Sequence, residues 1–152
     1  MFKMPHGNGI AQNIIELFQG IFAFTTSNVD IGTYILISKN KIKTITKNLI
    51  EMDDTNFEKY FDVYSPNRNL AMQLLTSDIM ESLINFYTEY NLDFEIIIRN
   101  NTVYLRFFTG PMFEPISENP IDKQLLFTYF CILEFILDVT KKINSTLNNL
   151  ET

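Results

Sequence analysis

The sequence is poor in the residues from which most metal sites and nucleophilic enzyme sites are built. Its 152 residues include one cysteine, one histidine and no tryptophan. A structural zinc site needs several Cys or His ligands, and a Ser-His-Asp or Cys-His mechanism needs a histidine beside its partners. The only histidine, His6, lies near the N-terminus, far in sequence from any carboxylate cluster. We therefore expect no metal, no cofactor and no catalytic triad.

Glycine and basic residues are also in short supply. The close pair of glycines, Gly7 and Gly9, neither follows a strand nor opens a helix, which argues against a nucleotide-binding loop. Twelve Lys and Arg stand against 18 Asp and Glu, giving a formal net charge of -6. The electrostatic field of a negatively charged protein repels phosphate backbones, so we expect no nucleic-acid partner.

No apolar run is long enough to cross a membrane. The longest block runs from Leu125 to Val139 and is interrupted by Thr128, Glu134 and Asp138. A spanning helix needs about 20 nearly uncharged residues, so we expect no membrane span in this chain. The first nine residues lack the basic and apolar parts of a signal peptide. Cys131, inside the apolar block, is expected to be a small buried side chain in a reducing compartment such as the cytoplasm.

The residues that are present indicate one domain with an aromatic core. A chain of this length suits a single domain, and its 14 Phe and 7 Tyr supply many rings for the interior. We expect a flexible lead-in over residues 1–12 and a single α+β domain over residues 13–150. The predicted fold is an antiparallel sheet of about five strands packed with two main helices, the C-terminal helix being long.

The clearest local pattern is a β-hairpin over residues 94–108. Asn100 and Asn101 tolerate the positive φ angles of a two-residue turn. The resulting register gives one apolar and one mostly polar face, as in a half-covered sheet. The predicted apolar pairs are Ile98 with Val103, Ile96 with Leu105 and Phe94 with Phe107; the opposite face pairs Arg99 with Thr102, Ile97 with Tyr104 and Glu95 with Arg106.

The first part of the chain is less clear. Residues 13–26 fit either a helix or a strand, and residues 33–38 are typical of a strand. The polar turn between them predicts a hairpin if both are strands. The polar segment 39–56 is expected to be a solvated connection, with or without one more edge strand, and residues 57–64 end as a strand.

Three helix starts are predicted from capping residues. Ser65 followed by Pro66 favours a short helix, and Thr76 caps a second one. The second helix carries an apolar stripe of Ile79, Leu83, Phe86 and Tyr90. Asn119-Pro120 predicts the start of the last helix, whose stripe either packs on the sheet or zips against a second copy. That stripe comprises Tyr129, Leu133, Ile136, Thr140, Ile143, Leu147 and Leu150.

A set of four phrases resembles a known family. They are Phe61-Asp62-Val63-Tyr64-Ser65, Leu74-Leu75-Thr76, Val103-Tyr104-Leu105 and Met112-Phe113-Glu114-Pro115. In this order and at this spacing they resemble a bacterial family catalogued as domain of unknown function 3137, over about residues 17–147. The phrase from Leu17 to Phe22 resembles a strand of that family, which favours the strand over the helix for residues 13–26.

The resemblance also implies a cellular setting. Members usually carry a membrane-anchoring region ahead of this domain, and no such region is present in this chain. We therefore expect this chain to be either the soluble C-terminal portion of such a protein or a stand-alone relative. In the first case the resemblance implies a cytoplasmic domain of a membrane-associated bacterial protein, held at the inner face of the membrane through a segment absent from this chain.

The resemblance further directs attention to the polar residues Asp62, Tyr64, Ser65, Thr76 and Glu114. These residues also have a structural explanation, in which Ser65 and Thr76 cap helices and Tyr64 ends a strand. We expect Asp62, Tyr64, Arg68 and Glu114 to line a groove where a strand end, helix starts and the loop after the hairpin meet. Such a groove would bind a ligand or peptide. The predicted function is a non-catalytic protein-interaction or ligand-binding domain, with a protein partner or a homo-oligomer as the expected assembly.

Two alternatives remain at this point. Glu134 and Asp138 lie one helical turn apart and could hold a metal or act as an acid and base pair, giving a carboxylate or metal-dependent enzyme. Pairing of Asp138 with Lys142, four residues on, is the structural explanation of the same residues. The second alternative is a homo-oligomeric structural assembly domain formed through the last helix.

Overall fold

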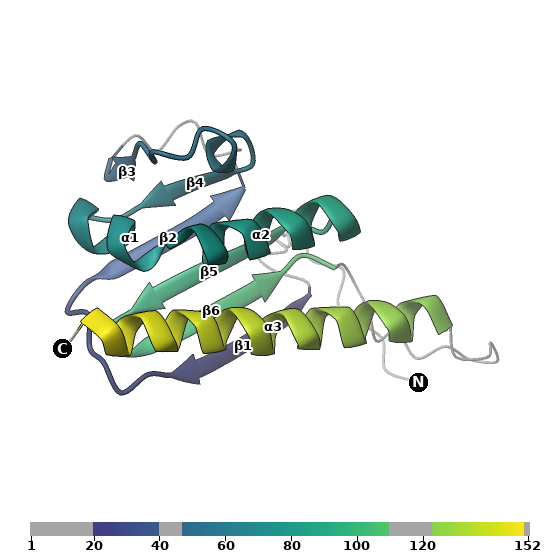
Figure 1. The fold of residues 1–152 in the computed structure, drawn as a ribbon. Coiled ribbons are helices and arrows are strands. Elements are labelled where there is room, and N and C mark those ends of the chain that lie inside the picture. Colours follow the sequence, from purple (N-terminus) through teal and green to yellow (C-terminus); the bar gives the residue numbers. More distant parts are fainter. Residues whose placement is uncertain (1–19, 40–46, 110–122, 151–152) are drawn as a thin grey trace, which may run out of the picture.

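The computed structural model describes residues 20–39, 47–109 and 123–150 (Figure 1). Within them an antiparallel sheet has the strand order β1-β6-β5-β2-β4-β3. Its strands are β1 (Ile21–Thr26), β2 (Tyr34–Lys39), β3 (Leu49–Ile50), β4 (Phe61–Tyr64), β5 (Phe94–Arg99) and β6 (Thr102–Phe107). The α+β class is confirmed, with six strands in place of about five, because the segment predicted as a solvated connection contributes the short edge strand β3.

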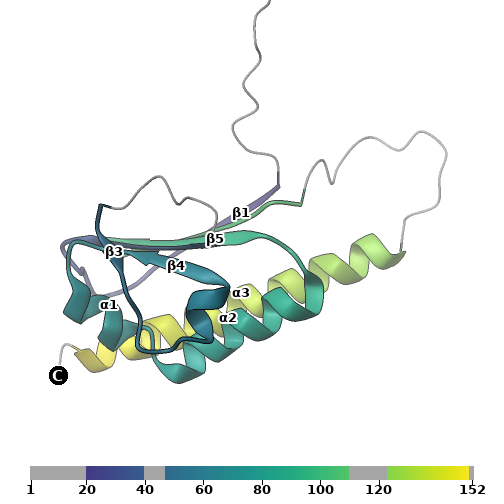
Figure 2. The ribbon, with the colours of Figure 1, turned by 90° about the horizontal axis from the view of Figure 1, so that it is seen from above.

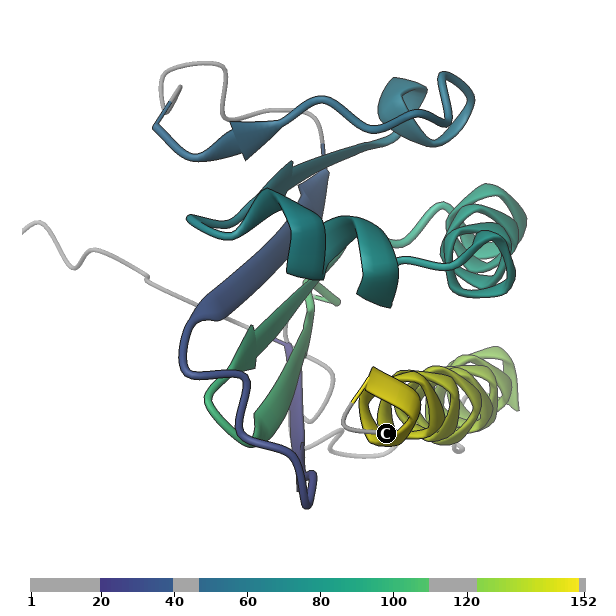
Figure 3. The same ribbon diagram turned by 60° about the vertical axis from the view of Figure 1, so that its left-hand side comes forward.

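The helices all lie on one side of this sheet, as Figures 2 and 3 show. They are α1 (Arg68–Leu74), α2 (Ser77–Tyr90) and the long α3 (Lys123–Leu150), and a 3-10 turn, η1 (Phe57–Lys59), precedes β4. None of the helices in the described ranges combines the length and apolar character needed to cross a membrane.

The predicted β5–β6 hairpin is confirmed residue by residue. Of the two turn residues, Asn100 has the expected positive φ, 54°, whereas Asn101 does not. All six predicted cross-strand pairs are present, from Phe94 with Phe107 to Arg99 with Thr102. The apolar set faces the helices and is buried, so the local turn and the period of two were enough to fix this register.

The predicted hairpin between the first two strands is wrong. β1 pairs with β6, and β2 lies between β5 and β4. The connection from β1 to β2 passes around the tip of the β5–β6 hairpin, where the amides of Ser27 and Ile31 donate to the carbonyls of Asn101 (2.7 Å) and Asn100 (3.0 Å). Inserting β5–β6 between β1 and β2 places the most apolar hairpin of the chain at the centre of the sheet.

The capping predictions have different outcomes. Thr76 caps α2, accepting from the amide of Ile79 at 3.5 Å. Ser65 does not cap α1; its hydroxyl accepts from the amide of Asn67 at 3.1 Å, and the Asn67 side chain is the cap of α1. Asparagine is as good a cap as serine, and Ser65 instead forms the turn that leads into the helix. The predicted start of the last helix at Asn119-Pro120 lies outside the described residues.

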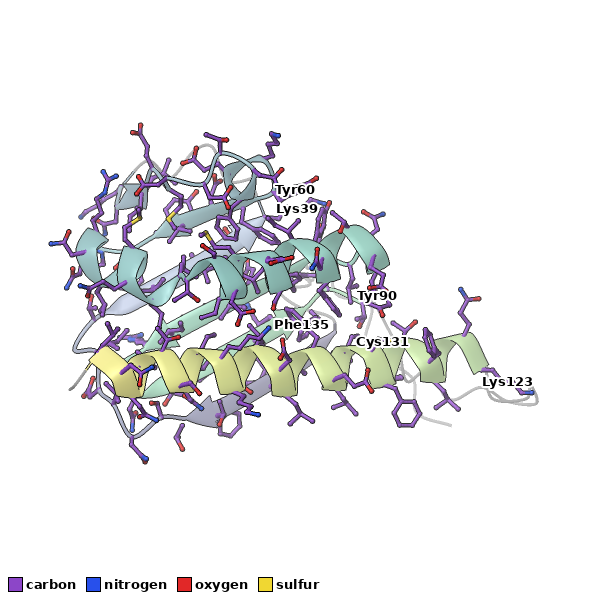
Figure 4. All side chains as sticks on the ribbon, viewed as in Figure 1. Lys39, Tyr60, Tyr90, Lys123, Cys131 and Phe135 are labelled. Carbon is purple, nitrogen blue, oxygen red and sulfur yellow. The ribbon has the colours of Figure 1, made fainter. Side chains whose placement is uncertain are left out.

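The core is aromatic, as the composition predicted. Phe135 of α3 lies between that helix and α2 in Figure 4, and its ring stacks on Phe86 with centroids 4.0 Å apart. Phe94 and Phe107, both on the sheet, contact the ring of Phe135 edge-on. Cys131 is buried, as expected.

The apolar stripe predicted on the last helix divides between core and surface. Thr140, Ile143 and Leu147 are buried, which bears out packing on the sheet for that part. Leu133 and Leu150 are exposed. The other buried positions among the described side chains of α3 are Cys131, Ile132, Phe135 and Val139.

Candidate binding face

The side of the sheet opposite the helices carries a continuous set of side chains. Strand side chains alternate between the two faces, so each strand sends every second residue to this open face. The strand registers align these residues in rows that run across the sheet. In Figure 2 the three helices lie together beneath the sheet, which leaves this face without a helix from the described part of the chain.

The central row is apolar over its whole length. It starts at Phe24 on the edge strand β1, crosses all six strands and ends at Leu49 on β3. Its length is roughly 24 Å, the sum of five inter-strand spacings. We call it the apolar row, and its members in order are Phe24, Tyr104, Ile97, Leu36, Tyr64 and Leu49.

Exposure along the apolar row is greatest at its two edges. Phe24 is 67% exposed and Leu49 is 44% exposed, whereas Tyr64, next to Leu49, is only 4% exposed. Phe22 lies beside the row on β1, and its ring stacks on Tyr104 with centroids 6.1 Å apart. A partner can therefore reach the row from β1 to β2, and again at Leu49 on β3, but not at Tyr64.

A charged row lies on one side of the apolar row. Arg106 is ion-paired with Glu95, its cross-strand neighbour in the hairpin. Ser38 and Asp62 continue this row on β2 and β4. Because the guanidinium of Arg106 already has an anionic partner, this row offers no free cation to a ligand.

A hollow of about 520 Å³ lies over the row at β2 and β5. Leu36 and Ile97 supply its apolar lining, and Tyr34 and Arg99 line it from the neighbouring row. The hydroxyl of Tyr34 accepts a hydrogen bond from the side-chain amide of Asn48 at 2.9 Å. Among the described residues Arg99 has no ion-pair partner and it is exposed. The hollow therefore combines an apolar lining with an available positive charge, and its volume lies in the range of ligand pockets.

Two of the predicted site residues lie on this open face. Asp62 and Tyr64 are neighbours on β4, and the tyrosine hydroxyl donates to the carboxylate at 3.3 Å. Burial raises the pKa of Tyr64 above its ordinary value, and the nearby Asp62 carboxylate raises it further. Tyr64 adjoins Leu36, which lines the hollow, but its own burial leaves little of it for a ligand to touch.

The other two predicted site residues are Arg68 and Glu114. Arg68 is exposed at the start of α1, and its guanidinium donates to the backbone carbonyl of Glu51 at 3.1 Å. That contact ties α1 to the segment after β3. Glu114 lies outside the described residues, so the predicted grouping of four is not tested.

The carboxylate pair on α3 has a structural explanation. Asp138 forms an ion pair with Lys142 at 2.9 Å, the pairing expected four residues apart, and Lys142 also reaches Asp78 of α2 at 3.3 Å. Glu134 is exposed. In the described ranges no three His, Cys, Asp or Glu side chains are grouped as metal ligands.

Sequence reasoning missed the residues that define the hollow. Tyr34 and Leu36 alternate with buried Ile35 and Ile37 along β2, and this alternation was the available signal. The neighbouring positions Ile97 and Arg99 were correctly assigned to the outer face of the hairpin. The pairing of β2 with β5 brings Tyr34 and Leu36 next to Arg99 and Ile97, and no local pattern predicted that pairing.

The fold and this face define a small α+β protein whose helices cover one side of an antiparallel sheet and whose other side presents a ligand-sized hollow. The chain belongs to the family described as "Protein of unknown function (DUF3137)", whose family model matches residues 16–145. No curated protein and no solved structure matches the chain.

Proposed function

We propose that this protein is a non-catalytic binding domain that receives a peptide segment of a partner protein on the open face of its sheet. The observation that carries the proposal is the hollow beside Arg99, which lies over the middle of the apolar row, at Leu36 and Ile97. An apolar surface of this extent, outside the core, is typical of a site that another molecule covers.

The chemistry of the face selects the kind of peptide. Phe24 and Tyr104 offer aromatic surface on which bulky side chains of the peptide can pack. Leu36 and Ile97 line a hollow that is large enough for one or two further side chains of the peptide. Arg99 supplies a guanidinium that can bind a carboxylate through two parallel hydrogen bonds. The expected ligand is therefore a segment with bulky apolar residues and an Asp, a Glu or a C-terminal carboxylate.

The proposed setting is the cytoplasm, next to a membrane protein. The single cysteine, Cys131, is free and buried, which suits a reducing compartment. Membrane association is part of the proposal because of the family resemblance.

A peptide-display selection tests the proposal directly. A library of random 12-residue peptides would be selected for binding to the immobilised protein. The affinity of each selected peptide would then be measured by fluorescence polarisation. Peptides enriched in aromatic or aliphatic residues together with a carboxylate are expected. Arg99→Glu should weaken their binding by about tenfold or more, since a hydrogen bond to a charged group contributes roughly 1.5 to 3 kcal/mol.

The matched control is Lys141→Glu. It makes the same charge change at an exposed residue of α3, on the helix side of the sheet. Its affinity should stay within about twofold of the wild type, because long-range charge effects are screened at physiological salt. Equal losses in the two variants, or binding that Arg99→Glu leaves unchanged, would refute the assignment of the site.

A further inference from the structure

A second apolar surface lies on α3, on the side of the helix that faces away from the core. Five side chains form it, with exposed fractions from 43% to 70%. We call it the outer stripe; it consists of Leu126, Phe127, Phe130, Leu133 and Leu137. In Figure 4 the lower edge of α3, turned away from α2, carries a ring and aliphatic side chains in its N-terminal half.

The outer stripe is confined to this half of the helix. Beyond Leu137 the same outward side carries Lys141, Ser145 and Asn148, all exposed. The helix therefore changes from apolar to polar along its solvent side, while its inward side stays apolar except at Thr140. Packing among the described residues requires only the inward side, so nothing in that part of the chain accounts for the apolar outward half.

The area of the outer stripe matches what a specific dimer requires. A Phe or Leu side chain that is about half exposed leaves roughly 100 to 150 Å² in water, so five leave on the order of 600 Å². This is the size of the largest apolar patches seen on monomers, which are often functional. Two copies facing each other would bury about 1,200 Å² from these side chains alone, within the range of specific interfaces.

The spacing of the outer stripe makes it complementary to itself. Leu126, Phe130, Leu133 and Leu137 follow one another at steps of four, three and four residues. These are the steps of a helix seam that packs against another helix. The order is the same when read in either direction, so an antiparallel copy places Leu126 opposite the partner's Leu137 and Phe130 opposite the partner's Leu133. A two-fold axis requires this reciprocity.

We propose that two copies of this chain form an antiparallel dimer through the outer stripe of α3. The two-fold axis passes between the levels of Phe130 and Leu133. Glu134, one turn after Phe130, lies at the rim of the contact, where its carboxylate keeps its water. The dimer uses a different surface from the open sheet face, so the peptide site proposed above stays accessible in both copies.

The first test is the molar mass of the 152-residue chain. Light scattering and analytical ultracentrifugation over about 1 to 100 μM should give twice the chain mass of 17.8 kDa at the upper concentrations. The double variant Phe130→Glu, Leu133→Glu should raise the dissociation constant by about 100-fold or more, because central apolar residues dominate such contacts. The matched control Ser145→Glu, Asn148→Glu changes the polar half of the same side and should leave the constant within about twofold.

Circular dichroism keeps this test interpretable. All four substituted side chains of α3 are exposed, so each variant should retain the helix signal of the wild type. A wild type that stays monomeric at 100 μM overturns the proposal. A dimer that the double variant leaves intact overturns it as well, since the contact then lies elsewhere.

Thiol cross-linking tests the direction of the helices. In a Cys131→Ala background, the double variant Leu126→Cys, Leu137→Cys should form covalent dimers with a short bifunctional reagent. Leu137→Cys alone should not, because antiparallel packing separates the two copies of residue 137 by about 16 Å along the helix axis. Efficient cross-linking of the single variant would show a parallel arrangement and overturn the antiparallel one.

A membrane surface is the other occupant that an apolar helix side can have, and the same variants distinguish it. Sedimentation with neutral phosphatidylcholine vesicles should leave the wild type in the supernatant. A monomer that binds the vesicles, and loses binding in Phe130→Glu, Leu133→Glu, would overturn the dimer in favour of a lipid contact.

Discussion

Removal of the Phe135 ring is expected to be among the most destabilising single changes in the protein. The side chain is only 7% exposed and lies where α3, α2 and the sheet meet. Its ring stacks on Phe86 at 4.0 Å between centroids and meets Phe94 edge-on at 5.2 Å. Truncation to alanine leaves a cavity walled by aromatic rings on several elements, which cannot all move inward together.

The magnitude follows from two contributions. Phe→Ala changes in cores cost about 3 to 5 kcal/mol through lost burial and the cavity left behind. Aromatic pairs contribute about 0.5 to 1.5 kcal/mol beyond burial, and Phe135 makes several of them. We therefore expect Phe135→Ala to lower the free energy of unfolding by about 4 kcal/mol. Phe135→Leu keeps most of the volume and should lose roughly 1 to 2 kcal/mol.

The assay is urea unfolding followed by circular dichroism, at two protein concentrations so that any linked association is detected. With an m-value of about 2 kcal/mol per M, the alanine variant should unfold at a midpoint about 2 M lower. Phe24→Ala is the control, because it removes the same ring from a position that is 67% exposed, and it should lose less than about 1 kcal/mol. The reasoning fails if the two alanine variants lose similar amounts, or if leucine at 135 costs as much as alanine.

Two further substitutions test the sheet edge and the contact between the helices. A Cβ at Gly20 would lie 1.9 Å from the carbonyl oxygen of Phe107, so Gly20→Ala should cost about 2 to 3 kcal/mol in urea unfolding. Gly32→Ala meets open space at a φ of 60° and should cost only about 1 kcal/mol; the reverse order would contradict the clash. For Lys142, hydrogen bonding to Asp138 raises the pKa above the ordinary 10.5, so its stabilisation is present below that pH and is lost as pH rises through the raised pKa. Lys142→Met should therefore be less stable than wild type by up to about 1 kcal/mol from pH 7 to 10, with the gap closing above pH 10.5; a gap that widened there would disprove this account.

Much of the fold could be predicted from the sequence wherever neighbours in sequence are neighbours in space. The Asn100-Asn101 turn and the alternation on either side of it fix six cross-strand pairs without help from the rest of the chain. The same holds for the Thr76 cap of α2 and for the ion pair between Asp138 and Lys142. Each of these depends on contacts that span at most about a dozen residues, which local geometry determines.

The candidate site could be predicted only in part, for a related reason. Asp62 and Tyr64 were correctly placed at a strand end, but their burial depends on which strands flank β4. Tyr34 and Leu36 become part of a hollow only because β2 pairs with β5, some sixty residues away along the chain. A capping serine and a capping asparagine are also too similar in energy for sequence to separate Ser65 from Asn67.

The sequence by itself determined the α+β class, the central hairpin, the aromatic core and the shortage of residues for nucleophilic or metal chemistry. Tertiary structure alone decided that β1 joins β6 and not β2, and that α3 turns Phe135 inward and Leu137 outward. Long-range pairing and helix rotation are chosen by competition for burial among distant segments. The apolar row exists for the same reason, because its six members come from six strands and meet only once the sheet is assembled.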